Sequence, residues 1–199
     1  MADLRPATPD DRELLARIGA EGFFHDPVLS WVLQDDATRM EQLIHLFGGI
    51  VDDMLPGRGR IDLADAASAA FWREPGFDET RTASDRLGDA PPEEVSAYTD
   101  DEMARFAILG TAMHESHPTE PHWYLNIVST LPSHQSQGLG ARVLAPVLAL
   151  ADEAGQRCYL ESTNPRNRTL YYRHGFEDAG DIELDGGPSM RQMWRDPRG

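Results

Sequence analysis

Apolar residues recur at helical spacing through the first part of the chain. A threonine, a proline and two aspartates at positions 8–11 precede Leu14, Leu15 and Ile18, which is the pattern of a helix start followed by one apolar face. Residues 26–55 keep this spacing, and the proline and glycines of 56–59 interrupt it. The sequence therefore predicts a helical region within residues 1–60.

Short runs rich in aromatic and β-branched residues follow and alternate with helical segments. Residues 80–92 are polar with scattered glycine and proline, which predicts a loop. The strongest strand pattern is PHWYLNIVSTLP, residues 121–132. The elements expected from residue 60 onward are two strands in 60–76, a helix in 96–118, the strand of 121–132, a helix ending at Gly155, a strand in 157–162, a short helix in 168–175, a strand around 181–184 and a last strand near 189–195.

Helices near the start and strands alternating with helices in the second half indicate a mixed α/β fold. A length of 199 residues is typical of one domain. The chain lacks the run of about 18 apolar residues that a membrane span needs, and its charged start lacks the apolar segment of a signal peptide. We therefore expect one soluble, cytoplasmic domain over residues 1–199, with no membrane partner.

The charge balance is strongly acidic. There are 34 acidic and 18 basic residues, the formal net charge is −16, and every basic residue is arginine. An acidic chain without a basic patch argues against nucleic-acid binding through phosphate contacts. The charge has two remaining interpretations, solubility and the electrostatic steering of a cationic partner. The single cysteine, Cys158, lies in a predicted strand and is interpreted as a small core residue rather than a nucleophile.

Two closely spaced glycines, Gly138 and Gly140, stand where the helix after residue 132 begins. A nucleoside-triphosphate loop would need a lysine, which the chain lacks, and the dinucleotide fingerprint would need a glycine where Val143 stands. The pattern that fits is Q-x-x-G-x-G, formed by Gln135 and the two glycines. Backbone N–H groups at a helix start bind anions, and glycine keeps such a concavity free of side chains. The alternative is a glycine hinge before a core helix.

The wider order of motifs extends this pattern. From Trp123 to Phe176, the strand, the HQSQGLG loop, a helix, the strand CYLES and the segment N…LYYRHGF follow one another. This order resembles the GNAT superfamily of acyl-CoA-dependent N-acetyltransferases. DPVLSW, FWREPG and MWRDP resemble a bacterial branch of the family that includes puromycin acetyltransferase-like proteins. The resemblance implies a central, mostly antiparallel sheet flanked by helices, with an acceptor-side region in 1–60 and an acetyl-CoA-binding core in 120–180.

The resemblance also implies a coenzyme site, with acetyl-CoA as cosubstrate and no metal. In the family, the strand before the glycine loop pairs its backbone with the pantetheine arm, and the loop N–H groups hold the pyrophosphate. The residues of this chain at those positions, together with the family asparagine and tyrosine, are Val128, Ser129, Thr130, Gln135, Ser136, Gln137, Gly138, Leu139, Gly140, Ala141, Asn164 and Tyr171.

The chemistry of acyl transfer assigns further roles. When a neutral amine attacks a thioester, a fixed backbone N–H stabilises the charge on the carbonyl oxygen, and a proton donor assists the departing thiolate. The resemblance implies Tyr171 for that donor, and Tyr172 is interpreted as a core aromatic. Some relatives carry a carboxylate at the position of Tyr124, so the base is left to His122 or Glu161. Either could act through water, or bind the acceptor's ammonium instead.

The acceptor site is expected against the N-terminal helices. Side chains proposed to line it are Phe24, Asp26, Trp31 and Tyr124. The histidines at 114, 117 and 122 match no zinc-ligand pattern, and no metal is expected.

The leading hypothesis is acetyl transfer from acetyl-CoA to a primary amine of a small molecule. Two alternatives remain: acetylation of a protein N-terminus or lysine, and a non-catalytic acyl-CoA-binding sensor or scaffold of the same fold. The chain is expected to be a monomer or a homodimer, the latter paired through its last strand.

Overall fold

One seven-stranded sheet organises the molecule. The computed structural model describes residues 3–55, 57, 59–77 and 97–199. The strands lie in the order β1-β2-β3-β4-β5-β7-β6, and neighbours are antiparallel except for the parallel pair β4 and β5. They are β1 (Leu4–Pro6), β2 (Arg60–Ala64), β3 (Ser68–Arg73), β4 (Trp123–Thr130), β5 (Cys158–Ser162), β6 (Glu177–Ile182) and β7 (Met190–Arg195).

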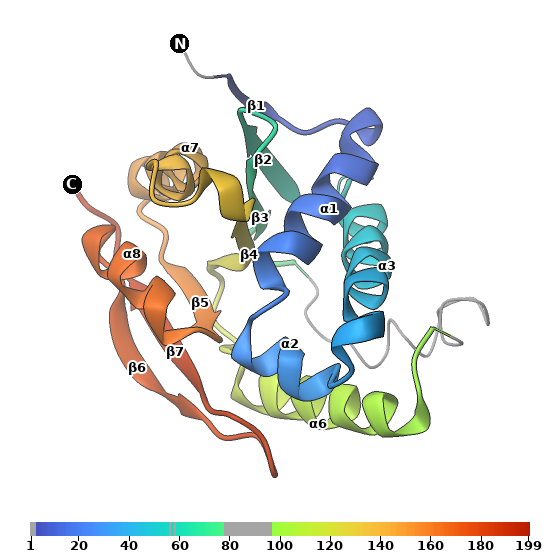
Figure 1. The fold of residues 1–199 in the computed structure, drawn as a ribbon. Coiled ribbons are helices and arrows are strands. Elements are labelled where there is room, and N and C mark those ends of the chain that lie inside the picture. Colours follow the sequence, from blue (N-terminus) through green and yellow to red (C-terminus); the bar gives the residue numbers. More distant parts are fainter. Residues whose placement is uncertain (1–2, 56, 58, 78–96) are drawn as a thin grey trace.

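Helices cover both faces of this sheet, as Figure 1 shows. One apolar cluster joins α1, α2, α3 and α6 to β2, β3 and the later half of β4. A second joins α7 and α8 to β5 and the first half of β4. The α-helices are α1 (Arg12–Phe23), α2 (Pro27–Val32), α3 (Asp36–Met54), α6 (Asp100–Ser116), α7 (Leu139–Ala154) and α8 (Arg168–Arg173), and three 3₁₀ turns are η1 (Pro9–Asp11), η2 (Pro132–His134) and η3 (Pro165–Asn167).

A bulge at Asn126 changes which face β4 presents. Trp72 of β3 pairs with Leu125 and Phe71 pairs with Ile127, so Asn126 is the extra residue between them. Leu125 consequently packs in the cluster under α7, whereas Ile127 packs in the cluster under α1. The mixed α/β fold expected from the sequence is confirmed.

The structure corrects the helical expectation for residues 26–55. Leu33 leaves the helical conformation, with φ −105° and ψ 85°, and ends α2. Asp35 then caps a separate helix, because its carboxylate accepts a hydrogen bond from the Ala37 N–H at 2.9 Å. Two caps within ten residues, at Asp26 and Asp35, thus divide one apolar pattern into two helices.

Other boundaries follow the sequence more closely. The two strands in 60–76 and the helix in 96–118 are present as β2, β3 and α6. The strand expected around 181–184 begins earlier, at Glu177, and ends at Ile182. The loop expected at 80–92 lies outside the described residues. None of the helices in the described ranges has the length and hydropathy that crossing a membrane would take.

Candidate functional site

The parallel strands β4 and β5 separate soon after they meet. Their pairing consists of Trp123 with Cys158 and Tyr124 with Tyr159. Beyond these pairs β5 continues beside β7, while β4 continues beside β3 (Figure 1). The backbone of β4 from the bulge to Thr130 therefore has no strand ladder on its β5 side within the described sheet.

The predicted residues Val128, Ser129 and Thr130 lie on this unpaired part of β4. Their side chains already have neighbours. Val128 packs against the α7 cluster, the Ser129 hydroxyl donates to the Ile18 carbonyl at 2.6 Å, and the Thr130 hydroxyl lies 2.8 Å from that of Ser68. What this stretch offers to a ligand is therefore its backbone.

The glycine loop follows β4 through η2 and is held by its own side chains. The Gln135 amide donates to the Thr130 carbonyl at 3.2 Å, and the Gln137 amide donates to the Ser133 carbonyl at 3.3 Å. Ser136 adopts a left-handed φ of +61° between them. Both glutamine side chains thus form hydrogen bonds within the loop and its flanking strand, and the loop residues Gln135, Ser136, Gln137 and Gly138 are exposed.

The N-terminus of α7 has no side-chain cap. Gly138 occupies the cap position at φ +81°, and the first helical bond runs from the Arg142 N–H to the Gly138 carbonyl at 3.2 Å. The first-turn N–H groups, those of Leu139, Gly140 and Ala141, precede that bond. Such donors, with the helix dipole behind them, form an anion site.

The two glycines differ in backbone conformation and in what a side chain would meet. A Cβ on Gly138 would meet nothing within 4 Å, so this position requires glycine for its positive φ. A Cβ on Gly140 would stand 3.3 Å from Cδ2 of Leu170, so a larger residue here would need a small shift of that side chain.

The two adjacent tyrosines of α8 reverse part of the sequence expectation. Tyr171 is 6% exposed, lies in the α7 cluster and contacts the edge of Phe176. Tyr172, expected in the core, is 48% exposed and its hydroxyl donates to Asp178 at 2.9 Å. The six-residue helix presents one tyrosine to the core and the next to solvent, because consecutive positions lie about 100° apart.

Burial raises the pKa of the Tyr171 phenol, and the nearby charge of Asp26 adds to the effect. The phenol is therefore protonated throughout the physiological pH range and is available as a hydrogen-bond donor. Asn164, the family asparagine by resemblance, caps η3: its side-chain oxygen accepts from the Arg166 N–H at 3.1 Å.

Glu161 and Tyr124 form a buried polar pair with a partner that the sequence did not indicate. The Glu161 side chain is 2% exposed, and its carboxylate lies 3.2 Å from Nδ1 of His117. Tyr124 hydrogen-bonds to the same carboxylate, and burial, followed by the charge of Glu161, raises the pKa of Tyr124 well above its ordinary value. His117 stands at the C-cap of α6, and only the folded chain brings it to β5.

His122 lies beside His117 but does not share its contact with Glu161. Its Nδ1 lies 2.6 Å from the Glu120 carbonyl, and its ring is 5.2 Å from that of His117 and 5.2 Å from that of Trp194. Among the described residues, no group of three or more His, Cys, Asp or Glu side chains is arranged to hold a metal ion.

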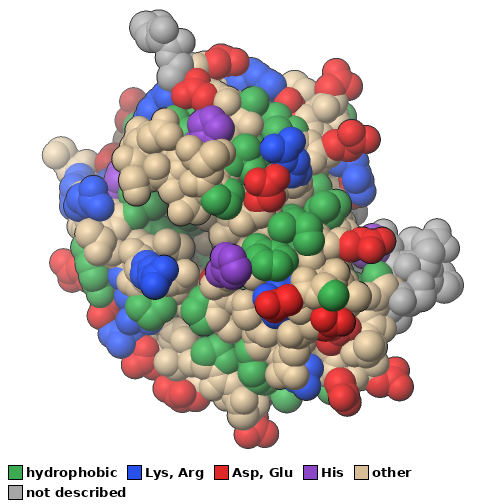
Figure 2. Space-filling view, in the orientation of Figure 1, with side chains coloured by type: hydrophobic (Ala, Val, Ile, Leu, Met, Phe, Trp, Pro, Cys, Tyr) green, Lys and Arg blue, Asp and Glu red, His purple; other side chains and the backbone are tan. Residues whose placement is uncertain are grey.

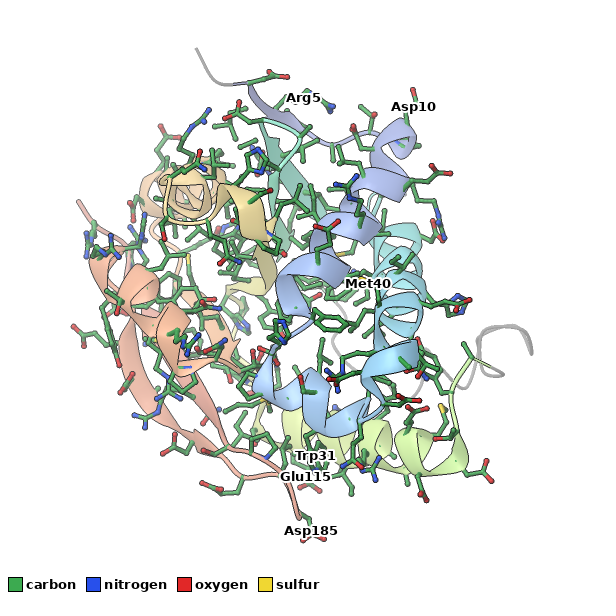
Figure 3. All side chains as sticks on the ribbon, in the orientation of Figure 1. Arg5, Asp10, Trp31, Met40, Glu115 and Asp185 are labelled. Atoms are coloured by element: carbon green, nitrogen blue, oxygen red, sulfur yellow. The ribbon has the colours of Figure 1, made fainter. Side chains whose placement is uncertain are left out.

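The structure gives each residue expected to line an acceptor site a different neighbour, with Tyr124 beside Glu161 as described above. Phe24 lies under the Arg39 guanidinium, whose Cζ is 5.3 Å from the centre of the Phe24 ring. The Trp31 indole donates to the Gly186 carbonyl at 2.9 Å, and Figure 3 shows it beside the turn that carries Asp185. Asp26 instead lies at the end of β5, where its carboxylate accepts a hydrogen bond from the Thr163 hydroxyl at 2.5 Å.

Acidic and arginine side chains are interspersed on the face shown in Figure 2. Arginines form ion pairs on several elements, as with Arg142 and Asp65 at 2.8 Å. On this face, the net charge of −16 is therefore expressed as carboxylates dispersed among arginines.

Comparison with known proteins identifies relatives of this arrangement. The model of the acetyltransferase (GNAT) family matches residues 61–176. A crystal structure from Corynebacterium glutamicum, described as histone acetyltransferase HPA2 and related acetyltransferase, is 28% identical and superposes with a TM-score of 0.71, covering 100% of this chain and 97% of its own.

Two further structures share the fold at lower identity. Arylalkylamine N-acetyltransferase 2 from Aedes aegypti is 11% identical, with a TM-score of 0.60 and 99% of each chain covered. The PaiA N-acetyltransferase from Thermoplasma acidophilum, in complex with coenzyme A, is 14% identical, with a TM-score of 0.54, covering 98% of this chain and 99% of its own.

Proposed function

Because the chain belongs to the acetyltransferase (GNAT) family, we propose that it transfers the acetyl group of acetyl-CoA to the primary amine of a small molecule. The observation that carries the proposal is the separation of β4 from β5 directly before the uncapped N-terminus of α7. The first feature leaves a strand edge unpaired, and the second supplies an anion site. The two follow one another along the chain.

We assign the pantetheine arm to β4 and the pyrophosphate to α7. The arm contains two amide groups, and an unpaired strand edge binds amides as it would bind another strand. The first-turn N–H groups at Leu139, Gly140 and Ala141 suit the pyrophosphate charge. Support comes from the side chains of 128–130 and of the two loop glutamines, which are engaged within the protein and leave the backbone groups to the ligand.

In the transfer step, the amine nitrogen forms a bond to the thioester carbonyl carbon and the carbon–sulfur bond breaks. A backbone N–H of the unpaired β4 segment stabilises the charge that develops on the carbonyl oxygen. Tyr171 donates a hydrogen bond to the sulfur as it leaves. Its buried phenol is a suitable donor because its raised pKa keeps the proton in place.

On the acceptor side, the amine loses its first proton to solvent before it attacks as the neutral base, and we propose that Glu161 binds the acceptor's ammonium group as it arrives. Its carboxylate already interacts with His117 and Tyr124, which hold the charge in a fixed position. The net charge of −16 favours the approach of a cationic amine.

By resemblance, we place the protein in the bacterial branch that includes puromycin acetyltransferase-like proteins. We also propose that it is a cytoplasmic enzyme and that it acts as a monomer or homodimer.

Thiol release with a panel of amines tests the proposal. Purified protein and acetyl-CoA are mixed with 2-phenylethylamine, agmatine or a lysine-containing peptide, and free thiol is followed with a chromogenic disulfide. We expect release that depends on enzyme and on one of the two small amines. Faster release with the peptide would instead support a protein acetyltransferase, and tight acetyl-CoA binding without release from any amine would support a sensor.

A further inference from the structure

Asp26 is a buried carboxylate with contacts on two sides. One oxygen caps α2 by accepting from the Val28 N–H at 3.0 Å and the Leu29 N–H at 3.2 Å. The other accepts from the Thr163 hydroxyl at 2.5 Å. The residue is 4% exposed, although both of its chain neighbours are exposed.

The position of Asp26 is set by the packing of α1 on β4. Gly22 lies against Ser129, so closely that a Cβ there would stand 2.0 Å from the Ser129 hydroxyl oxygen. Four residues later, Asp26 reaches Thr163, which directly follows β5. The short segment from Gly22 to Asp26 thus spans the gap between the two separated strands, where the thioester is placed by the proposed function.

The charge of Asp26 acts on Tyr171, although no hydrogen bond joins the two side chains. Among the described residues, this carboxylate charge is the one that acts on the pKa of the Tyr171 phenol, and it raises that pKa further after burial. Burial likewise raises the pKa of Asp26 itself, and the hydrogen bond from Thr163 opposes this rise. A carboxyl group whose pKa moves toward neutrality is suited to exchanging protons during a reaction.

The charged and titratable groups around Asp26 come from three elements. Tyr171 of α8 is the titratable group whose pKa is raised by the charge of Asp26. His25 precedes it in the chain and is exposed. Arg39 of α3 contacts the neighbouring Phe24, donating to its carbonyl at 3.5 Å.

We propose that Asp26 is the proton acceptor for the attacking amine, a catalytic role that rests on the proposed acetyl transfer. When the neutral amine adds to the thioester carbonyl carbon, its nitrogen becomes cationic and passes one proton to the Asp26 carboxylate. The carbon–sulfur bond then breaks, and its electron pair leaves on sulfur. Tyr171 gives its proton to that sulfur and recovers a proton from the Asp26 carboxyl through an intervening water, so the amide and the thiol form and both side chains return to their starting states.

This relay resolves a difficulty with a lone tyrosine. A phenol with a raised pKa is a weaker acid than a thiol, so it cannot by itself protonate a departing thiolate favourably. A carboxylic acid behind the phenol makes the net transfer favourable, because the proton then passes from carboxyl to thiol. Glu161 does not offer this path, because its charge is not among the causes that raise the pKa of Tyr171.

The pH dependence of turnover tests the assignment through two variants of different kinds. Asp26→Asn keeps an oxygen for the α2 cap but cannot accept a proton, so kcat should fall on the order of 10²-fold. Thr163→Val removes the hydrogen bond that lowers the pKa of Asp26, so the acid limb of the profile should move to higher pH while activity at alkaline pH is kept. Asp35→Asn is the matched control, because it makes the same change at the cap of α3.

Turnover is measured against pH with 2-phenylethylamine and with agmatine. Each variant is compared with wild type on the same amine, so that the effect of the amine's own ionisation is the same in both pH profiles. Asp26→Asn should lose the acid limb and retain acetyl-CoA affinity, and Asp35→Asn should match wild type. The inference is overturned if Asp26→Asn keeps the wild-type profile, or if Thr163→Val leaves the acid limb in place. In either case wild-type turnover would still support acetyl transfer, whereas no wild-type turnover with any amine would overturn both.

Discussion

Gly138 and Gly155 bracket α7 in the same left-handed backbone conformation, with φ of +81° and +63°. At both positions the space for a Cβ is empty to 4 Å. The two residues therefore carry the same conformational requirement, while only Gly138 lies at the end assigned to the pyrophosphate.

This pair separates strain from coenzyme binding. Gly138→Ala and Gly155→Ala should each lower the free energy of unfolding by about 1 kcal/mol, because alanine resists positive φ. Only Gly138→Ala should weaken acetyl-CoA binding. Urea unfolding and calorimetric titration measure the two effects, and equal binding by both variants would argue against the loop as a coenzyme site.

Tyr171→Phe should lower kcat about 10- to 100-fold and leave the dissociation constant of acetyl-CoA nearly unchanged, because the phenol acts on the departing sulfur. Tyr172→Phe is its matched control: it removes one exposed hydroxyl contact to Asp178 and should leave kcat unchanged. Steady-state kinetics on both variants provide the check. A parallel loss of affinity and turnover in Tyr171→Phe would show that the ring supports the site rather than the reaction.

The contact between α1 and β4 predicts a steric coupling. Gly22→Ala should destabilise the fold by about 1–3 kcal/mol, because its Cβ would stand 2.0 Å from the Ser129 hydroxyl oxygen. Ser129→Ala in the same chain should recover part of that loss, since it removes the nearest atom. Unfolding free energies of both single variants and the double variant measure the coupling, and strictly additive effects would contradict it.

Asp11 should make stability depend on acid pH. Arg5 hydrogen-bonds to both Asp11 oxygens at 2.7 Å and thereby holds the pKa of Asp11 below its ordinary value. The ionised carboxylate therefore stabilises the fold above its unfolded pKa of about 4, and this stabilisation is lost as the pH falls through the folded pKa. Asp11→Asn should be less stable than wild type at neutral pH, and urea unfolding should show the difference shrink below about pH 4. A constant difference would show that the charge is not responsible.

The parts of the site that are local in sequence were predictable from it. The strand, the glycine loop and the helix follow one another within residues 121–155. The β-branched run indicates the strand β4, and the apolar spacing indicates the helix α7. The mapping onto Tyr171 depended on resemblance and stays a prediction, whereas the expectation that Tyr172 is the core aromatic was wrong. Periodicity over six residues is too short to choose between adjacent aromatic positions.

The contacts that join distant segments were not predictable. Asp26 and Thr163 are 137 residues apart, and His117 and Glu161 are 44 apart, so nothing in local spacing indicates either pair. The break between α2 and α3 was missed for a different reason. The apolar face continues across it, and only the capping by Asp35 and the non-helical Leu33 reveal two helices.

Calorimetric titration of acetyl-CoA into the wild-type protein, with coenzyme A and NAD as comparisons, tests the central claim most directly. The account predicts saturable one-site binding of acetyl-CoA, binding of coenzyme A through the same pyrophosphate and pantetheine contacts, and no binding of NAD, for which the loop lacks the third glycine. Absence of acetyl-CoA binding would contradict the account, because the separated strands and the uncapped α7 would then be structural features without a coenzyme.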